Sequence, residues 1–430
     1  MTLHRRIGRA CIAALVCLLL TSTFISPIQP ASALATQSAR VAAPQRSPAQ
    51  QLRVFQKLWK IVNDNYIYPN FNGIDWQAKK VEIEAQINAG VDDSQFYFML
   101  RKLIESLNDQ HSVFLPPYVA EEIFDLYFNT GAYEGVGLVT ALNREKHYLY
   151  VLQVVPGSSA ERAGIRPHDH ILTIGGYPAV DRDGYSQSFL LLGPVGSPVA
   201  LTVQTADGAT RSFDLPRETL PSLELVDARL LPNAGERKIG YLNIPTFFSE
   251  TIDKRTRAGL QALMNQAGGK LDGLVIDMRI NSGGSIVALG NTLGFFSRGN
   301  LGRFSTRKGP KGGLSARGEN IGNSQTVPIV VLIGPDTASA AEIFAGALQA
   351  KGRAKLIGQS SAGNIEGLRT YVFEDNSLLF IAEQSFKLPN GYNWEGVGLQ
   401  PVVTTAGAWD EITYDNDPAI AAAVNTLAGP

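Results

Sequence analysis

A buried strand that leads through a tight turn into a helix limits the fold of this protein more than any other feature. Residues 329–333, Ile-Val-Val-Leu-Ile, form a continuous apolar run rich in β-branched side chains, which is typical of a strand buried on both faces. Residues 334–336 break the run, and strong helix formers follow from Ala340. Strands and helices alternate from residue 238 onward, so we expect a mostly parallel sheet covered by helices.

This unit places Ser339 at the N-terminus of a helix. The helix dipole and the free N–H groups there favour negative charge, which suits a nucleophilic serine and its oxyanion. A structural interpretation competes, because residues 339–342, Ser-Ala-Ala-Glu, fit the S-x-x-E capping box. The local pattern alone favours the cap, and the rest of the sequence has to decide.

Length and charge set broad limits on domains and partners. The 430 residues are enough for two or three domains. The sequence has 38 basic and 39 acidic residues and a formal net charge of -1. This balance gives no broad attraction to nucleic acid or acidic lipid, and we expect neither as a partner.

Residues 1–35 are predicted to be a signal peptide. Basic residues come first, an apolar run extends from about residue 10 to 25, and small-x-small cleavage patterns follow. We expect an exported protein, periplasmic or extracellular, with no stable membrane span after signal removal. An uncleaved anchor is the alternative, although the apolar run is short for a span.

Both cysteines, Cys11 and Cys17, lie inside the predicted signal peptide. The mature protein therefore has no thiol, which excludes a cysteine nucleophile, a disulfide framework and a cysteine-based metal site. No cofactor and no metal ion are expected.

Residues 36–50 are predicted to be a flexible linker and residues 51–119 an N-terminal helical cap. The linker is rich in Ala, Gln, Ser and Pro, and three helical patterns follow it. The sequence Asp-Gln-His-Ser comes just after the third helix and contains His111. Of the five histidines, one is in the signal peptide and three are in the next module, so His111 is the one left for catalysis. A hydrogen-bonded bystander is the structural alternative.

Residues 120–217 have short alternating strands joined by glycine-rich turns. The segments 133–138 (Tyr-Glu-Gly-Val-Gly-Leu), 154–165 and 169–176 resemble a PDZ domain. PDZ domains bind the C-terminus of another polypeptide as an added strand. The resemblance implies that Val136, Gly137 and Leu138 form the loop that binds the terminal carboxylate. A spacer of PDZ shape without a ligand is the alternative, and His168 stands where such domains usually have a small turn glycine.

Residues 218–430 are predicted to be the α/β core. Residues 277–285 form a polar, glycine-rich turn after a buried strand, without the spacing and lysine of a phosphate-binding loop. Residues 306–323, rich in Gly, Lys and Arg, are predicted to be a surface loop that could act as a lid.

The order of these blocks carries a second resemblance. A helical cap, a PDZ-like module, residues 277–284, residues 337–343 and residues 391–401 follow one another as in the C-terminal processing (tail-specific) serine peptidases and the wider family that includes the tricorn core. The resemblance implies an α/β fold with a ClpP–crotonase-like catalytic core, an N-terminal helical cap and an inserted PDZ domain. It also implies Ser339 as nucleophile, with the N–H groups of Ala340 and of Gly283 or Gly284 as oxyanion donors.

The sequence departs from this family's Ser/Lys pattern. Asn364 stands at the lysine position and Leu368 at the glutamine position. The amide nitrogen of asparagine has no available lone pair, so a Ser/Lys dyad at this position is excluded. We retain Asn364 as a candidate substrate-binding residue.

The sequence is nearer to the Ser/His branch, which includes the tricorn-like members. His111 resembles the histidine of that branch's D-x-H-type motif, and Glu395 matches in part its glutamate near the C-terminal E-x-x-G-V-x-P pattern. We therefore predict an exported serine endopeptidase that cleaves unstructured or C-terminal regions of proteins. Its partners would be protein or peptide substrates with free C-termini, and a homo-oligomer is an open alternative.

Other functions remain open at this point. A catalytically degenerate protein of the same fold would bind peptides or other ligands without cleaving them, and a serine hydrolase could act on other substrates. Lys387 as a rearranged base has no motif to support it.

Overall fold

The structure is a computed structural model that describes residues 45–109, 111–120, 133–143, 145–182, 184, 186–205, 207–221, 225–232, 236–249, 251–413 and 416–429. The predicted signal peptide and residues 36–44 of the predicted linker lie outside the described residues. Within these ranges, the helices are all too short or too polar to cross a membrane.

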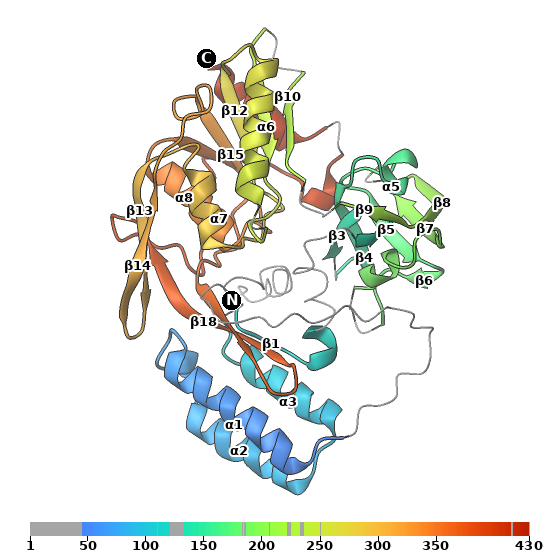
Figure 1. The fold of residues 1–430 in the computed structure, drawn as a ribbon, viewed down its shortest axis with the longest axis vertical. Helices are drawn as coiled ribbons and strands as arrows, with labels where there is room; N and C mark the ends of the chain where they lie inside the picture. The colour runs from blue at the N-terminus through green and yellow to red at the C-terminus, as the bar shows by residue number, and fades with distance from the viewer. Residues whose placement is uncertain are drawn as a thin grey trace, which may run out of the picture.

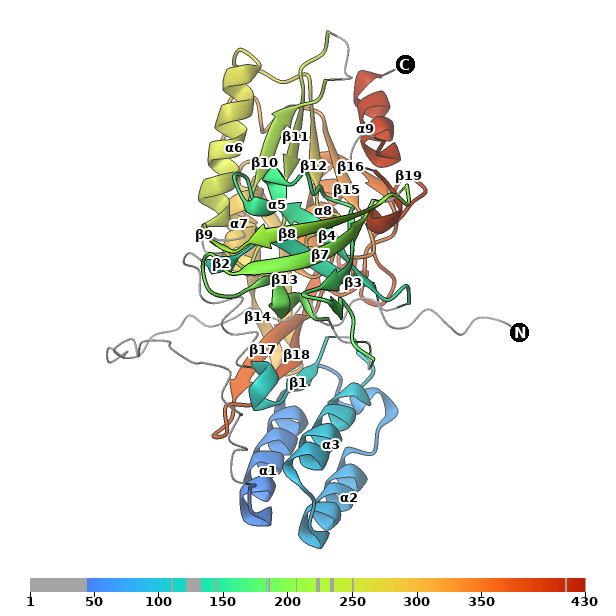
Figure 2. The same ribbon diagram turned by 90° about the vertical axis from the view of Figure 1, so that its right-hand side faces the viewer.

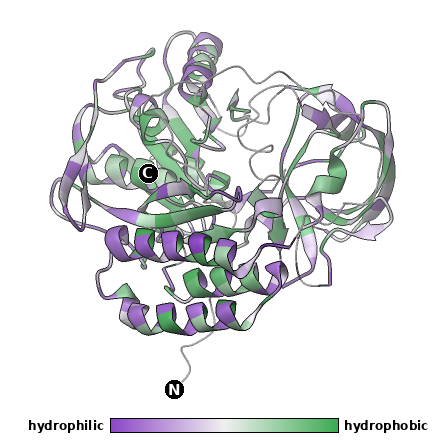
Figure 3. Cartoon of the chain, turned by 60° about the horizontal axis from the view of Figure 1, so that its bottom comes forward, coloured by the Kyte–Doolittle hydropathy of each residue, from purple (hydrophilic) through white to green (hydrophobic). Residues whose placement is uncertain are grey.

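Three helices form the N-terminal cap: α1 (Pro48–Asn65), α2 (Trp76–Ala89) and α3 (Asp93–Glu105), with a 3-10 turn at Phe71–Gly73. Ser47, Asp75 and Asp92 begin them, and each side chain accepts a hydrogen bond from the first turn. Figure 3 shows hydrophilic and hydrophobic residues alternating along these helices. Their apolar faces pack together and against the strand β18 (Leu378–Lys387).

A five-stranded antiparallel sheet connects the cap to the rest of the molecule (Figure 1). Its path is β1 (Val113–Leu115), β18, β13 (Gly299–Thr306) and β14 (Gly309–Ala316), with β17 (Gly367–Val372) also paired to β18. The prediction of a loop over residues 306–323 is wrong for its first half, because β13 and β14 form a hairpin. Leu314 and Ala316 are buried there, so tertiary packing overrides the low strand propensity of the glycines.

The PDZ-like module has its own apolar core and lies to one side of the α/β core (Figures 1 and 2). Its main sheet has the order β3 (Leu138–Asn143), β4 (Tyr148–Val154), β5 (His170–Ile174), β7 (Pro198–Gln204) and β8 (Thr210–Pro216). Smaller elements complete it: β2 (Tyr133–Gly135) paired with β9 (Glu218–Leu220), β6 (Tyr177–Pro178), α5 (Ser159–Arg162) and a 3-10 turn at Ser188–Leu191. Strand β3 is at the edge of the main sheet.

The α/β core is a six-stranded sheet with helices on both faces. Its order is β10 (Asp227–Leu230), β11 (Ile239–Asn243), β12 (Gly273–Asp277), β15 (Ile329–Ile333), β16 (Ala354–Gly358) and β19 (Val403–Thr404). All neighbouring pairs are parallel except β10 with β11. The helices are α6 (Ile252–Gln266), α7 (Ile286–Leu293), α8 (Ala340–Ala350) and α9 (Pro418–Ala428).

Strand β15 is buried on both faces, as the sequence predicts. Its odd-numbered residues pack with α6, α7 and α8, and its even-numbered residues pack with α9. Alternate side chains of a strand point to opposite faces, so one apolar run supplies two separate cores. The backbone leaves this strand directly into the turn that carries Ser339.

Candidate active site

Ser339 has a backbone conformation that serines rarely adopt. Its φ is 53° and its ψ is -122°, whereas Ser158 and Ser285, which begin other helices, have extended backbones and side chains that accept cap hydrogen bonds. Such a conformation costs about 1–3 kcal/mol and persists only where surrounding contacts impose it. Glu342 does occupy the capping-box position, accepting from the Ser339 N–H at 3.2 Å. The strained backbone favours a functional role over a plain cap.

Two neighbouring segments hold this turn in place. The Ser339 N–H donates to the Asn364 carbonyl at 2.6 Å, and the Ala338 N–H donates to the Asn281 carbonyl at 3.1 Å. Gly283 lies against the turn so closely that a Cβ at this position would be 2.7 Å from Ser339 Cβ. The glycine-rich turn over residues 277–285 therefore lies directly against the candidate nucleophile.

The three predicted oxyanion donors differ in whether their N–H groups already donate a hydrogen bond inside the protein. The Gly283 N–H already donates to the Asn281 side chain at 2.8 Å. The N–H groups of Gly284 and Ala340 donate no hydrogen bond within the described part of the protein. Ala340 is the first residue of α8, where N–H groups have no partner inside the helix. Of the three, Gly284 and Ala340 are the better candidates.

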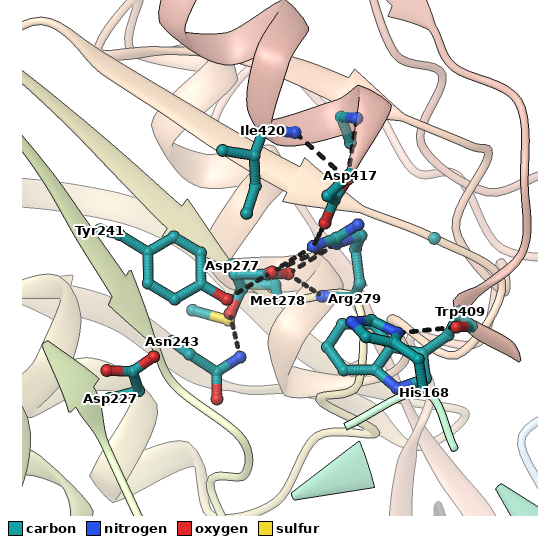
Figure 4. A network of polar contacts seen from close by, with 12 residues as sticks. His168, Asp227, Tyr241, Asn243, Asp277, Met278, Arg279, Trp409, Asp417 and Ile420 are labelled. Atoms are coloured by element: carbon teal, nitrogen blue, oxygen red, sulfur yellow. Dashed lines mark hydrogen bonds and ion pairs between the residues drawn. The ribbon is translucent and has the colours of Figure 1, made fainter. Parts of the chain in front are cut away.

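A buried ionic network holds the start of the glycine-rich turn (Figure 4). Arg279 donates to both carboxylate oxygens of Asp277, at 3.0 and 2.6 Å, and to Asp417 at 2.6 Å. Burial would raise the pKa of Asp277, but the charge and hydrogen bonds of Arg279 lower it below its usual value. The Arg279 guanidinium carbon also lies over the Trp409 ring, 5.1 Å from its centroid, in a cation–π contact. The end of β12 is thereby joined to the start of α9.

His111 is buried in the turn between α3 and β1, with 1% of its surface exposed. Asp109 shapes this turn, since its carboxylate accepts from the N–H groups of His111 at 3.0 Å and Ser112 at 2.8 Å. The Ser112 hydroxyl in turn accepts from the Ala382 N–H on β18 at 3.1 Å. The aspartate of the D-x-H-type motif therefore positions the histidine through the backbone.

Glu395 is the side-chain partner of His111. Its Oε1 lies 3.1 Å from Nε2 of His111, and its Oε2 accepts from the Ile365 N–H at 2.8 Å. Burial would lower the pKa of His111, but the hydrogen bond and charge of Glu395, with the charges of Glu366 and Asp109, raise it. No hydrogen bond of the described residues involves Nδ1 of His111, which leaves that nitrogen for another partner.

The structure adds Glu366, which the sequence analysis did not identify. It is 2% exposed, and its Oε2 has no hydrogen-bond partner among the described residues. Burial and the charge of Glu395 raise the pKa of Glu366 to about 8. One ligand-type atom each from His111, Glu366 and Glu395 lies within 4.8 Å of the others. The sequence signal that could have indicated Glu366 was an acidic residue directly after Ile365 and directly before the strand β17.

Asn364, at the family's lysine position, lies beside the candidate nucleophile. Its carbonyl accepts from Ser339, and its N–H donates to Glu342 at 2.7 Å. Its side-chain nitrogen is buried without a hydrogen-bond partner among the described residues. Burial raises the pKa of Glu342 to about 7, although hydrogen bonds from Ser361, Asn364 and Gly363 favour the carboxylate.

The structure therefore brings His111 and Glu395 into direct contact. The backbone of residues 364–365 links this pair to Ser339, because Ile365 donates to Glu395 and Asn364 accepts from Ser339. No hydrogen bond of the described residues joins Ser339 directly to His111. Leu368, at the family's glutamine position, and Lys387, the alternative base, form no hydrogen bond with this group among the described residues. Leu368 packs into the cap, and Lys387 is exposed at the end of β18.

The predicted carboxylate loop of the PDZ-like module precedes the edge strand β3. The side chains of Val136 and Leu138 are buried in the module's core, so only their backbones can contact a ligand. Gly137 has a φ of 90°, and a Cβ there would be 2.2 Å from Ser158 Cβ. His168 keeps the left-handed backbone expected of a glycine, with a φ of 79°, and its Nδ1 lies 2.7 Å from the Trp409 carbonyl.

Comparisons with known proteins agree with this arrangement. The family model of peptidase family S41 matches residues 238–405, that of the PDZ domain residues 150–205, and that of the tricorn protease C1 domain residues 48–105. These matches confirm the predicted α/β fold with a helical cap and an inserted PDZ domain.

Relatives of known sequence and structure match most of this protein. A carboxyl-terminal-processing protease of Synechocystis sp. is 27% identical over 388 residues, covering 88% of this sequence and 87% of that protein. A chloroplastic C-terminal processing peptidase of Tetradesmus obliquus is 30% identical over 377 residues, covering 84% and 79%. The solved structure of a photosystem II D1 C-terminal processing protease has a TM-score of 0.58 at 27% identity, covering 83% of this sequence and 93% of that one.

Proposed function

Because the protein belongs to peptidase family S41, we propose that it is a serine endopeptidase with Ser339 as nucleophile, His111 as general base and Glu395 as the residue that orients His111. The observation that carries this proposal is the partly buried hydrogen bond between His111 and Glu395, which is linked to a strained Ser339 through the backbone of residues 364–365. Imidazole has a pKa suited to proton transfer near neutral pH, and a carboxylate on one nitrogen fixes which nitrogen accepts the proton.

In this mechanism Ser339 Oγ attacks the peptide carbonyl while Nδ1 of His111 takes the hydroxyl proton. The N–H groups of Gly284 and Ala340 stabilise the oxyanion. The C–N bond then breaks as His111 passes this proton to the leaving amine, and the acyl group stays on Ser339 Oγ as an ester. Water next attacks the ester carbonyl while His111 takes one of its protons, and His111 returns that proton to Ser339 Oγ as the ester bond breaks. Catalytic hydrogen bonds often form only when substrate is bound, so the missing Ser339–His111 bond is compatible with this scheme.

Substrate selection is assigned to the PDZ domain. An extended C-terminus can add to the edge strand β3, with its carboxylate at the backbone of Val136, Gly137 and Leu138. The relatives' names, which refer to carboxyl-terminal processing, support the same substrate class. The sequence of residues 1–35 supports export to the periplasm or the cell exterior.

The test uses the purified protein from residue 36 with casein as an unfolded substrate and a fluorophosphonate probe as a reporter of serine reactivity. We expect cleavage and labelling in wild type and in His147→Ala, which removes an exposed histidine of the PDZ domain. Ser339→Ala and His111→Ala should lose both. Full activity in His111→Ala would overturn the assignment of the base.

A binding protein without catalysis remains the second candidate, and Asn364 in place of the family lysine is the observation in its favour. It predicts that wild type is not labelled while a peptide with a free C-terminus still binds. Labelling of Ser339 in wild type would exclude it.

A further inference from the structure

The proposed general base, His111, lies close to two acidic side chains from distant parts of the sequence. His111 follows α3, Glu366 precedes β17, and Glu395 lies in the turn after Trp394. One nitrogen and two carboxylate oxygens lie within 4.8 Å of one another, and the three residues are 1%, 2% and 18% exposed. This group consists of metal-ligand residues, of which His111 and Glu366 are buried and Glu395 is partly exposed.

One carboxyl oxygen of this group has no hydrogen-bond partner among the described residues. Oε2 of Glu366 is buried and accepts no hydrogen bond from any described residue. Neither Glu366 nor Glu395 forms an ion pair with a lysine or arginine among the described residues. Tyr68 donates a hydrogen bond to the Glu366 side chain, and His111 and the Ile365 N–H donate to Glu395. No lysine or arginine of the described residues balances the two carboxyl groups, so the group is suited to a bound cation.

We propose that His111, Glu366 and Glu395 bind one zinc ion. One imidazole nitrogen with two carboxylate oxygens is a donor set for zinc, whereas calcium and magnesium prefer oxygen atoms alone. Ligand atoms around tetrahedral zinc lie roughly 3.4 Å apart, so modest side-chain rotations close the site from its present spacing. The Ile365 N–H, which donates to Oε2 of Glu395, supports that ligand from behind.

Zinc at this site inhibits the peptidase. A neutral imidazole that coordinates a metal through one nitrogen keeps its proton on the other, so His111 can no longer accept the Ser339 proton. Inhibition rests on the proposed function, whereas zinc binding rests only on the three side chains.

Binding is tested by calorimetric titration of zinc chloride into metal-free protein from residue 36, made with Ser339→Ala to avoid self-cleavage. We expect one site of micromolar or tighter affinity, and a cobalt spectrum typical of tetrahedral coordination. Glu366→Gln should weaken zinc binding tenfold or more, and His111→Ala should abolish it. Glu383→Gln is the matched control, because Glu383 is also buried but accepts a hydrogen bond from Tyr371. This variant should bind zinc as tightly as the parent protein.

Zinc should also raise the melting temperature of the parent protein, because a ligand that binds the folded state stabilises it. This measurement of zinc binding needs no further variant. The proposal fails if the parent shows no stoichiometric zinc site, or if the affinity survives both His111→Ala and Glu366→Gln.

Inhibition is measured separately, by fluorophosphonate labelling of the Ser339-containing protein with zinc and after addition of EDTA. Labelling that zinc suppresses and EDTA restores supports the inhibitory role. Zinc binding without any labelling in metal-free protein would overturn the proposed function and keep the site. Labelling in a protein that binds no zinc would overturn the site and keep the function.

Discussion

Ser339 is positioned by a residue that has no side chain. Gly283 has a φ of 106°, and a Cβ there would meet Ser339 Cβ at 2.7 Å and the Ala340 backbone nitrogen at 3.0 Å. The turn that carries the proposed nucleophile and the turn that carries a proposed oxyanion donor can therefore approach each other only because position 283 is glycine. We expect substitutions at this position to affect catalysis more than they affect folding.

Gly283→Ala should lower kcat/KM for peptide cleavage by about 100-fold or more, because the new methyl group displaces both the proposed nucleophile and its proposed oxyanion donors. The matched control is Gly309→Ala, at a positive φ of 127° where no atom lies within 4 Å of the added Cβ. It shares the backbone strain but should keep kcat/KM. Equal losses in both variants would show that strain, rather than the contact with Ser339, is responsible.

The second prediction at this scale concerns Glu342, whose pKa in the folded protein, about 7, lies above its ordinary value of 4.5. A carboxyl with a raised folded pKa contributes its full stability below pH 4.5 and loses it as pH rises through 7. The change amounts to roughly 3 kcal/mol for a fully buried group. Urea unfolding at about pH 5 and pH 8 should show this loss in wild type and a smaller loss in Glu342→Gln. A pH dependence that is the same in both would contradict the assignment.

The individual site residues were predictable to different degrees. Ser339, His111 and Glu395 belong to local motifs, so the sequence indicates them. Glu366 has no motif of its own, and its role depends on burial beside two residues that are far away in sequence. The same separation kept Glu366 out of the candidate site residues predicted from the sequence.

At the scale of elements, helix α8 depends on a close contact with Trp394, the residue before Glu395. A Cβ at Gly346 would lie 2.6 Å from the Trp394 ring, which is fully buried. Trp394 thereby fixes the turn that presents Glu395 to His111. Glycine inside a helix is otherwise unfavourable, so the packing explains its presence.

Gly346→Ala should therefore destabilise the protein by about 1–3 kcal/mol through overpacking, despite the higher helix propensity of alanine. Gly290→Ala in α7 is the control, because its Cβ would meet only Leu314 at 3.6 Å, and it should gain stability. Chemical unfolding of both variants measures the difference. Stabilisation by Gly346→Ala would show that Trp394 moves freely.

Elements with a strong local pattern were predictable, whereas those made by tertiary pairing were not. The strand over 329–333 and the helix from Ala340 are found as expected. The β13–β14 hairpin was missed, because its glycines and charged residues resemble a loop and its pairing depends on β18. A sequence pattern does not contain such long-range contacts.

At the scale of the whole molecule, the PDZ domain contacts the α/β core through the segment before α9. The Trp409 indole donates to the Val151 carbonyl at 3.0 Å, and its ring lies 4.3 Å from that of His168. The carboxylate of Asp410 accepts from Tyr148 at 2.7 Å and from Asn143 at 2.6 Å. These contacts come from residues of β3, β4 and the turn before β5, which belong to the same sheet as the proposed peptide site.

Trp409→Ala should therefore uncouple the two parts. It removes the hydrogen bond to Val151, the tilted ring contact with His168 and the cation–π contact with Arg279 in a single change. We expect scanning calorimetry to resolve a separate, earlier PDZ transition, and hydrogen exchange to increase around Val151. Asp207→Asn, an exposed substitution in the PDZ domain, should leave one cooperative transition. If Trp409→Ala unfolded in a single transition like wild type, other contacts would hold the PDZ domain against the α/β core. The position of the PDZ domain would then not depend on Trp409.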